Sequence, residues 1–309
     1  MSWKQWKAFY DKDINHLSIM NTAICPICKQ ITQKIAYKRI TPKGNLAKCA
    51  VCDIYFVWPK ASLPGGEVYN EDYYNAWAIK ELGSDGLFSM KKVTFDRLFD
   101  AIKISRPGSS ILDIGCAMGH LLEAAKEKCF DPYGIEISQY SADIARQKIG
   151  HDRIWVGDIT KMELPDKKFD VITAVDLIEH TYDTGLFFTI CGKLLKDNGY
   201  LLMVTPDIDS FSRKLTGKLW HNFNEQHVLF FSREAAFNLL NRYGFKVIKI
   251  DNFKKAVNFI YLKSVLRFYG RRILVFILSV VGFLLPKRLK RKNFLIPQGE
   301  MLIIARKRQ

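Results

Sequence analysis

The chain has 309 residues, of which 48% are hydrophobic and 25% are charged. This balance is that of an ordinary folded protein and excludes a mainly disordered, collagen-like or many-span membrane protein. Lys and Arg exceed Asp and Glu by 47 to 31, and the net charge of +16 favours anionic partners: nucleic acid, acidic lipid or a phosphorylated substrate. The excess is local, because residues 254–292 hold eleven Lys or Arg and no Asp or Glu.

Residues 1–60 are expected to form an N-terminal segment and a zinc ribbon. The first residues lack the apolar run and cleavage site of a signal peptide, so we expect a cytoplasmic protein with reduced cysteines. Two Cys-x-x-Cys doublets are separated by 20 residues, and each turn directs two thiolates to one point. Four thiolates complete a tetrahedral, and therefore structural, Zn²⁺ site made of Cys25, Cys28, Cys49 and Cys52.

Residues 61–105 are predicted to form a helical connector. A Pro-Gly-Gly break begins it, and an amphipathic helical pattern runs from Phe88 to Ile102. Between these two features, aromatic residues crowd together at Tyr69, Tyr73, Tyr74 and Trp77.

Residues 106–253 alternate between short apolar strands and helices. Expected strands are 111–114, 133–136, 153–156, 169–175, 199–205 and 245–250, and expected helices are 121–128, 138–148, 186–195 and 233–243. This alternation predicts a parallel, doubly wound sheet with helices on both faces, which is a Rossmann-like α/β fold.

The C-terminal part combines an insertion with a final strand. Residues 299–309 contain an alternating segment at 301–306, which we expect to pair with 245–250 as an antiparallel edge hairpin. Residues 254–298 would then project from the edge of the sheet as a basic, apolar insertion.

Acidic residues follow the first four predicted strands. Asp113 opens the turn Asp-Ile-Gly-Cys-Ala-Met-Gly, whose glycines let the backbone approach a cofactor at the carboxyl end of a parallel strand. Glu136 is placed to accept hydrogen bonds from ribose hydroxyls, Asp158 is placed to accept one from an adenine amino group, and Asp176 follows the fourth strand. A nicotinamide dinucleotide would need Gly-x-Gly-x-x-Gly, whereas this turn has Gly-x-x-x-Gly.

This series resembles the class I S-adenosylmethionine (SAM)-dependent methyltransferases. The glycine turn is similar to their first motif, acidic-x-Gly-x-Gly-x-Gly, with Ala117 at the middle glycine. The resemblance implies that Glu136 binds the ribose, that Asp113 borders the methionine portion, and that Asp158 and Ile159 frame the adenine. The implied SAM-binding set is Asp113, Gly115, Ala117, Gly119, Glu136, Ile137, Asp158, Ile159 and Asp176.

The zinc doublets, Tyr-rich connector and SAM core together are similar to a bacterial subgroup associated with cell-envelope saccharides. Its typical segments stand at 176–180, 205–207 and 225–231. Quinone-ring O-methyltransferases share an acidic-x-x-Glu-His arrangement that holds a divalent cation, which implies Mg²⁺ at Asp176, Glu179 and His180.

Two histidines are candidate catalytic residues. Methyl transfer needs an acceptor held in line and, for a hydroxyl acceptor, a base that removes its proton, a step that suits the near-neutral pKa of histidine. His180 follows the fourth strand beside the expected cofactor, and His227 lies in a later aromatic segment expected to cover the acceptor. For each of them, a hydrogen-bonded structural role is the alternative.

The insertion contains thirteen uncharged residues, 273–285, flanked by Arg and Lys. As a helix this run is about 20 Å long, too short for the ~30 Å hydrocarbon core of a bilayer. An apolar helix with many cations predicts an element in the plane of an anionic membrane surface. A buried core helix and a nucleic-acid patch are the alternatives, although binding to phosphate needs few exposed aliphatic side chains.

The sequence therefore predicts a SAM-dependent methyltransferase, peripheral on the cytoplasmic membrane face. We expect O-methylation of a small-molecule, glycan or lipid-linked acceptor, such as a cell-envelope saccharide or a quinone-like lipid. One alternative is an RNA methyltransferase that grips phosphate with its zinc ribbon and insertion, although the chain lacks the motifs of the familiar DNA-base enzymes. The other is a non-catalytic SAM-fold partner protein, against which the retained acidic residues argue.

Overall fold

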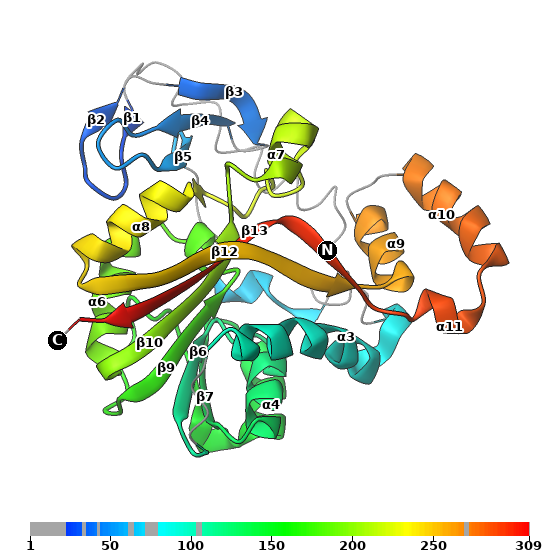
Figure 1. Ribbon diagram of the computed structural model, residues 1–309, viewed down its shortest axis with the longest axis horizontal. Coiled ribbons are helices and arrows are strands. Elements are labelled where there is room, and N and C mark those ends of the chain that lie inside the picture. Colours follow the sequence, from blue (N-terminus) through cyan, green and yellow to red (C-terminus); the bar gives the residue numbers. More distant parts are fainter. Residues whose placement is uncertain are drawn as a thin grey trace.

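A seven-stranded, mostly parallel sheet forms the centre of the protein (Figure 1). The computed structural model describes residues 23–32, 35–41, 44–60, 65–71, 80–102, 107–268 and 272–308. The strands lie in the order β12-β13-β10-β9-β6-β7-β8. Their bounds are β6 Ser110–Ile114, β7 Asp131–Glu136, β8 Ile154–Val156, β9 Phe169–Val175, β10 Leu195–Pro206, β12 Phe245–Val257 and β13 Phe294–Lys307.

The pairing of these strands confirms the predicted Rossmann-like fold and its antiparallel edge. Strands β10, β9, β6, β7 and β8 run parallel to one another. The final strand β13 runs antiparallel between β10 and β12, so that β12 and β13 form the expected edge hairpin. Both strands of the hairpin extend well past the segments predicted for them.

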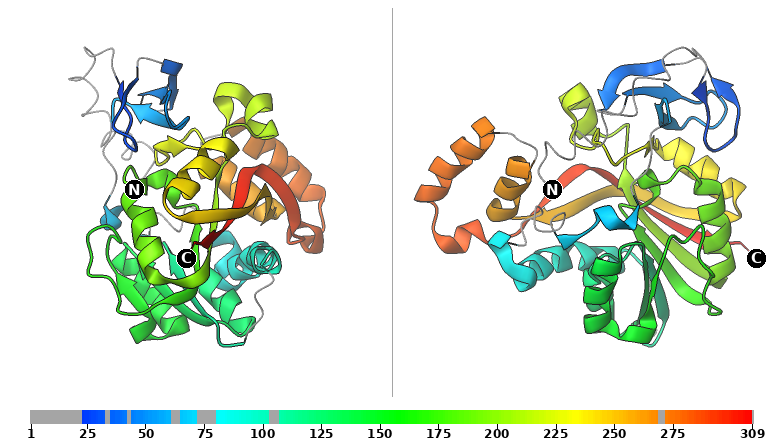
Figure 2. Two further views of the ribbon diagram at one scale, coloured as in Figure 1. Left: turned by 60° about the vertical axis from the view of Figure 1, so that its left-hand side comes forward. Right: turned by 180° about the vertical axis from the view of Figure 1, so that it is seen from behind.

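Helices cover both faces of the sheet (Figure 2). Helices α3 (Lys80–Asp100), α4 (His120–Glu127) and α5 (Gln139–Ile149) lie on one face, and α6 (Thr184–Leu194) and α8 (Arg233–Arg242) lie on the other. Side chains alternate along each strand, so that in β6 Ile111 packs with α3 and α4 whereas Leu112 belongs to the opposite core. Burial on both faces explains the continuous apolar runs in the sequence.

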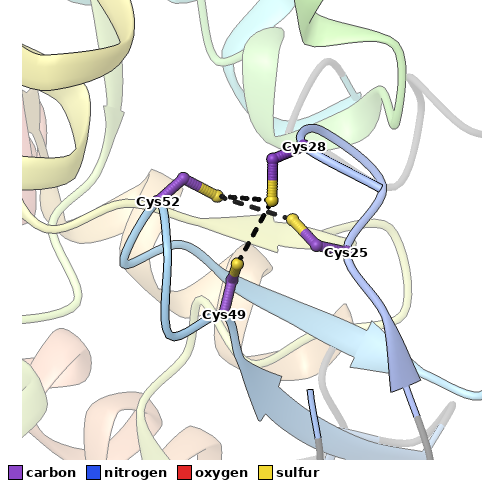
Figure 3. A group of neighbouring side chains, drawn as sticks. All are labelled: Cys25, Cys28, Cys49 and Cys52. Atoms are coloured by element: carbon purple, nitrogen blue, oxygen red, sulfur yellow. Dashed lines mark hydrogen bonds between the residues drawn. The ribbon is translucent and has the colours of Figure 1, made fainter. Parts of the chain in front are cut away.

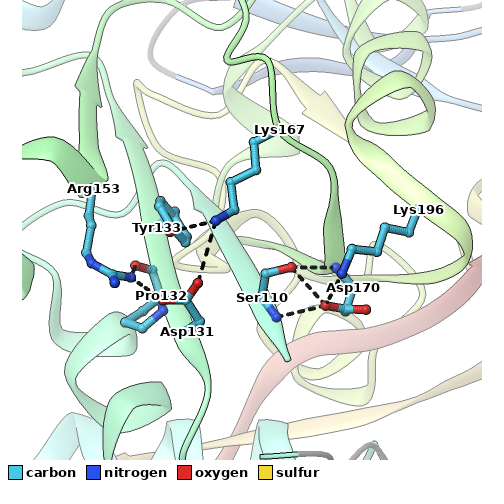
Figure 4. Close-up of polar contacts among 8 residues, drawn as sticks. All are labelled: Ser110, Asp131, Pro132, Tyr133, Arg153, Lys167, Asp170 and Lys196. Carbon is cyan, nitrogen blue, oxygen red and sulfur yellow. Dashed lines mark hydrogen bonds and ion pairs between the residues drawn. The ribbon is translucent and has the colours of Figure 1, made fainter. Parts of the chain in front are cut away.

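Polar contacts tie together the amino-terminal ends of the parallel strands (Figure 4). The Asp170 carboxylate in β9 accepts hydrogen bonds from the backbone N–H and the hydroxyl of Ser110, each at 2.8 Å, and pairs with Lys196 Nζ at 2.8 Å. Asp131 at the start of β7 forms ion pairs with Arg153 and Lys167. These contacts fix the amino-terminal ends of the strands and leave the loops at the carboxyl ends for a ligand.

The N-terminal module is a small sheet that takes one edge strand from the second half of the chain. Its four strands lie in the order β11-β5-β4-β3, beside a two-stranded β1-β2 ribbon. Leu229 in β11 lies opposite Phe56 in β5, and Phe230 packs with Trp220 in the core beneath. The bounds are β1 Ala23–Ile24, β2 Ile31–Thr32, β3 Ile35–Thr41, β4 Gly44–Lys48, β5 Tyr55–Trp58 and β11 Leu229–Phe230. The small sheet is therefore completed by a strand from the second half of the chain.

The described part of the connector consists of η2 (Gly66–Val68) and α3. The predicted helix 88–102 corresponds to the second part of α3, whose Leu98 and Phe99 are buried against the sheet. Three aromatic residues of the predicted connector, Tyr73, Tyr74 and Trp77, lie outside the described residues.

The insertion consists of three helices at the far end of the β12–β13 hairpin, on one side of the molecule (Figures 1 and 2). They are α9 (Phe259–Phe268), α10 (Arg272–Leu284) and α11 (Lys287–Lys290). Phe276 is 70% exposed and Phe283 is 88% exposed, so the alternative of a buried core helix is wrong. Within the described ranges, none of the helices combines the length and the apolar character needed to cross a bilayer.

Candidate functional site

The turn between β6 and α4 is wound tightly at the carboxyl end of the sheet. Gly115 and Gly119 both have φ +77°, and Ala117 between them has φ +47°. A Cβ atom at Gly115 would lie 3.1 Å from Leu177 Cδ1, and one at Gly119 would lie 3.1 Å from Ala145 Cβ. Only glycine fits these two positions without strain, whereas Ala117 adopts a left-handed conformation at a cost of about 1 kcal/mol. The curvature suits close approach of a cofactor, as the resemblance implies.

Glu136 lies directly across this turn. Its buried carboxylate accepts hydrogen bonds from the backbone N–H groups of Ala117 and Ser138, each at 2.8 Å. Burial raises the pKa of Glu136, although these backbone donors oppose the shift. The carboxylate thus joins the loops after β6 and β7, and its predicted contact with a ribose stays a prediction.

Residues 65–71 lie over the loop after β7. The Ser138 hydroxyl donates a hydrogen bond to the Tyr69 carbonyl at 2.6 Å. A Cβ atom at Gly66 would lie 2.3 Å from the Ile137 carbonyl oxygen, so this contact requires glycine. Ile137 itself remains 37% exposed. Sequence reasoning missed this contribution to the site because the Gly65-Gly66 pair was interpreted only as a break in the chain.

Replacing Glu136 by alanine is expected to weaken SAM binding by about 10–100-fold, because each lost hydrogen bond to a charged group costs about 1.5–3 kcal/mol. Isothermal titration calorimetry of the purified protein measures this. The exposed, ion-paired Glu127→Ala on α4 is the matched control and should bind SAM as the wild type does. Near-wild-type affinity of Glu136→Ala would remove the ribose assignment.

Asp113 is buried at the end of β6 and accepts a hydrogen bond from the Thr173 hydroxyl at 2.7 Å. Burial raises the pKa of Asp113 from its ordinary value of 3.8 to about 7, and the charge of Glu136 adds to the rise. A carboxyl group whose charge is so disfavoured is typical of a functional position.

The raised pKa of Asp113 makes stability depend on pH. The folded protein holds a proton that the unfolded chain releases, so the free energy of unfolding falls as pH rises from 3.8 to about 7. Asp113→Asn, which keeps the shape, should be more stable than the wild type at pH 8 by on the order of a few kcal/mol, and equal to it near pH 3. Urea denaturation at both pH values checks this. Parallel pH profiles for the two proteins would contradict it.

Asp158 and Ile159 follow β8. The Asp158 carboxylate accepts hydrogen bonds from the Thr160 backbone N–H at 2.9 Å and hydroxyl at 2.7 Å, and forms an ion pair with Lys161. Burial opposes ionisation, but these partners together lower the pKa of Asp158, which keeps the carboxylate charged. Ile159 is buried in the core, and the predicted role of this pair in framing an adenine stays a prediction.

Asp176 faces the edge hairpin. It adopts φ +54° at the end of β9, and its carboxylate lies 2.5 Å from Lys255 Nζ. Lys255 also pairs with the buried Glu300 at 2.8 Å, and these two acidic groups raise the pKa of Lys255 against the opposing effect of burial. An ion pair therefore connects the end of β9 to β12 and β13, a link with no signal in the sequence.

The donors implied for Mg²⁺ do not come together as expected. The group that gathers in the described part of the chain is Glu179, His180 and His227, whose ligand atoms lie within 4.8 Å of one another, and Asp176 is not part of it. Mg²⁺ prefers oxygen ligands, whereas this group offers two imidazoles and one carboxylate. The predicted magnesium site is therefore unsupported.

The two candidate histidines are neighbours. Their ring centroids lie 4.8 Å apart in an edge-to-face arrangement at 86°. His180 lies in η5 (Ile178–His180), and the Val228 backbone N–H donates to the Glu179 carbonyl at 2.9 Å, which brings His227 to the same place. Two residues 47 positions apart in the chain thus form one pair. The sequence predicted each histidine separately and did not predict that they meet.

A buried carboxyl group supports this pair. Glu179 is fully buried, the Thr205 hydroxyl donates to its Oε2 at 2.8 Å, and its Oε1 lies 4.0 Å from His227 Nε2. Burial raises the pKa of Glu179 well above its usual range and lowers that of His227 well below its usual range, so burial disfavours the charged form of each group. Sequence reasoning missed the role of Thr205. The only sequence signal for this residue was its place at the start of the Thr-Pro-Asp segment.

The four N-terminal cysteines converge on one point (Figure 3). The Sγ atoms of Cys25 and Cys52 are 3.5 Å apart, and those of Cys28 and Cys49 are 3.4 Å apart. The residue after each doublet, Lys29 or Asp53, has a left-handed conformation, so both turns have the same shape. The Val51 backbone N–H also points to Cys49 Sγ at 3.4 Å, as expected for a thiolate acceptor. The arrangement fits the predicted closed Zn²⁺ site.

Comparison with known proteins agrees with this geometry. Residues 90–250 match the family model described as a methyltransferase domain. The chain is 32% identical over 103 residues to the ubiquinone biosynthesis O-methyltransferase of Bradyrhizobium diazoefficiens, a match that covers 32% of this chain and 40% of that relative. The chain thus spans less than half the length of the curated relatives that it matches.

Two solved structures share the fold. A SAM-dependent methyltransferase from Archaeoglobus fulgidus gives a TM-score of 0.50 at 22% identity, over 76% of this chain and 100% of that chain. A methyltransferase structure from a Haloferax volcanii complex with the Trm112 methyltransferase activator gives 0.52 at 13% identity, over 76% and 98%. The family match covers more than half of the chain and includes the glycine turn, the acidic series and the histidine at the end of β9. The chain therefore belongs to the class I SAM-dependent methyltransferase family.

Proposed function

We propose that this protein transfers the methyl group of SAM to an oxygen atom of a lipid-borne acceptor at a membrane surface. The observation that carries the proposal is the His180–His227 pair. His180 lies three residues after Leu177, whose side chain packs beside Gly115 of the glycine turn. Curated relatives named ubiquinone biosynthesis O-methyltransferase support an oxygen acceptor. A quinone-like lipid and a cell-envelope saccharide on a lipid carrier both belong to this class of acceptor.

In this proposal His180 removes the proton of the acceptor hydroxyl. When bound, SAM supplies a methyl group activated by its positively charged sulfur. His180 is the more accessible ring, whereas His227 is only 8% exposed and its lowered pKa makes it a weak base. Contact with His227 holds the His180 ring in place, and the carboxyl group of Glu179 lies behind the pair, 4.0 Å from His227 Nε2.

The four-cysteine cluster holds a structural Zn²⁺ ion in this proposal. The left-handed residue after each doublet, the short Sγ–Sγ distances and a backbone donor to one sulfur support it. Four protein ligands leave no open position for a substrate, so the metal stabilises the module and does not act on the acceptor.

The three-helix insertion is proposed to lie on the membrane. Its longest helix, α10, exposes apolar side chains along its length, and cations flank it in the preceding segment and in α11. The exposed apolar side chains of α10 are Leu274, Phe276, Ile277, Val280, Val281, Phe283 and Leu284. Exposed apolar area on this scale marks an interaction surface, and the basic flanks favour an anionic leaflet.

The double substitution Phe276→Glu/Phe283→Glu is expected to reduce sedimentation with phosphatidylglycerol-containing vesicles by more than about tenfold, because each buried Phe contributes about 1.5–3 kcal/mol. Both side chains are exposed, so the fold should be kept. Phe237→Glu on α8, also at an exposed Phe, is the matched control and should sediment as the wild type does. Unchanged sedimentation of the double variant would remove the membrane from the proposal.

Methyl transfer itself is tested with methyl-labelled SAM. Purified protein is incubated with a bacterial membrane fraction, and label is counted separately in the organic extract, in RNA and in soluble material. The proposal expects label in the organic extract. Label in RNA instead would favour the RNA methyltransferase alternative, and SAM binding without label in any fraction would favour a non-catalytic role.

A further inference from the structure

The three helices of the insertion line an open cavity of about 310 Å³, which contains none of the residues predicted to bind SAM. Two phenyl rings and three cationic side chains dominate its lining: Phe259, Phe283, Lys263, Arg267 and Lys290. Two hydroxyl groups, those of Ser264 and Ser279, also line it. Its volume is within the range of small-molecule sites, about 300–1,000 Å³.

The charge of this cavity has one sign. Residues 254–292 contain no Asp or Glu, so the cations are not balanced by acidic residues of the same segment. In the part of the chain that the structure describes, neither Lys263 nor Lys290 forms an ion pair or a hydrogen bond through its ammonium group. The two residues line the cavity from α9 and α11, two helices joined only through α10. Two such ammonium groups beside the hydroxyl of Ser264 are suited to an anion with several oxygen atoms.

The rest of the lining is apolar. Phe259 and Ile260 of α9 form one wall, and the highly exposed Phe283 of α10 stands at the rim. The apolar surface of α10 continues from this rim toward Phe276. A free inorganic anion gains nothing from phenyl walls, whereas a molecule with a charged head and hydrocarbon chains matches both halves of the lining.

We propose that the cavity between α9, α10 and α11 binds the phosphate group of a phospholipid, with the acyl chains lying along the apolar surface of α10. This inference rests on the membrane part of the proposed function and names the lipid group that is recognised. Lys263 and Lys290 bind the phosphate oxygens, and the Ser264 hydroxyl donates to them, whereas the Ser279 hydroxyl donates to the Val275 carbonyl at 2.7 Å. A lipid bound in this way attaches the insertion to the bilayer at one defined point, whereas general attraction of cations to an anionic surface does not.

The test uses full-length protein and a soluble short-chain lipid, dihexanoyl phosphatidic acid, below its micelle concentration. Calorimetric titration should show binding, and Lys263→Gln/Lys290→Gln should weaken it by about tenfold or more. The matched control is Lys287→Gln/Arg288→Gln, which removes the same charge from exposed positions outside the cavity lining, and it should change the affinity by less than about twofold. Inorganic phosphate, titrated separately, should bind far more weakly than the lipid.

Equal losses in the two double variants would show that net charge and not the cavity determines binding, and would overturn the proposal. Inorganic phosphate binding as tightly as the lipid would overturn the assignment of a lipid. No binding of the lipid to the wild type would overturn it outright. SAM binding is measured in every variant, because it reports on the proposed methyltransferase independently of the lipid site.

Discussion

Replacing His180 with alanine is expected to slow methyl transfer by about 10²–10⁴-fold, the usual contribution of a general base. SAM affinity should stay within about twofold of the wild type, because this ring is assigned to the acceptor and not to the cofactor. The rate is measured as label transferred from SAM into the organic extract, and the affinity by calorimetry. A loss confined to the rate separates a catalytic histidine from one that only supports the fold.

Two further substitutions complete this experiment. His151→Asn is the matched control, at an exposed histidine between α5 and β8, and it should leave the rate unchanged. His227→Gln should reduce the rate less than His180→Ala does, since His227 is buried and is a weak base. If His227→Gln abolished transfer and His180→Ala did not, the roles of the two rings would be exchanged.

Loss of the metal is expected to unfold the N-terminal module. Cys49→Ser should release Zn²⁺ and lower the free energy of unfolding by on the order of several kcal/mol, because metal binding and folding of such small modules are coupled. His227 should be disturbed as well, since it lies two residues before β11, which pairs with β5 of the module. Zinc content by atomic emission and unfolding by circular dichroism measure the two effects.

The exposed Cys129, outside the cluster, offers the control. Cys129→Ser should retain zinc and wild-type stability. A wild-type protein free of zinc after purification without chelators would refute the site. If Cys49→Ser kept its full stability, the module would be shown to fold on packing alone, and the cluster would have no structural role.

The parallel core could be predicted from the sequence because its strands are buried on both faces. The strand 169–175 was predicted with the bounds that β9 has in the structure, since Val171 and Val175 face one apolar layer and Ile172 and Ala174 face the other. The edge hairpin was predicted too short. In β12 the polar residues Asn252 and Lys254 continue the strand after the apolar pattern stops, because β13 pairs with their backbone.

The site could be predicted only where one local segment contains the information. The glycine turn and the two cysteine doublets are such segments, and each has the expected shape. The ion pair of Asp176 with Lys255 and the meeting of His180 with His227 depend on tertiary contacts between segments far apart in the chain. Charge and residue type alone do not specify which distant partner an aspartate or an imidazole meets. Asp176 meets Lys255 and not the group of Glu179 and His180, so the structure does not support the magnesium prediction.

The pairing of β5 with β11 has a consequence for the order in which the protein assembles. During synthesis β5 is complete once residue 58 has been made, whereas its partner β11 follows only at residues 229–230. At 5–20 residues per second, the edge of β5 stays open for roughly ten to thirty seconds, a period in which neighbouring nascent chains can pair with it. All four cysteines of the cluster precede residue 53, so the metal can bind before that edge is covered. The order of these segments in the chain therefore allows the cysteine cluster to form before the small sheet is complete.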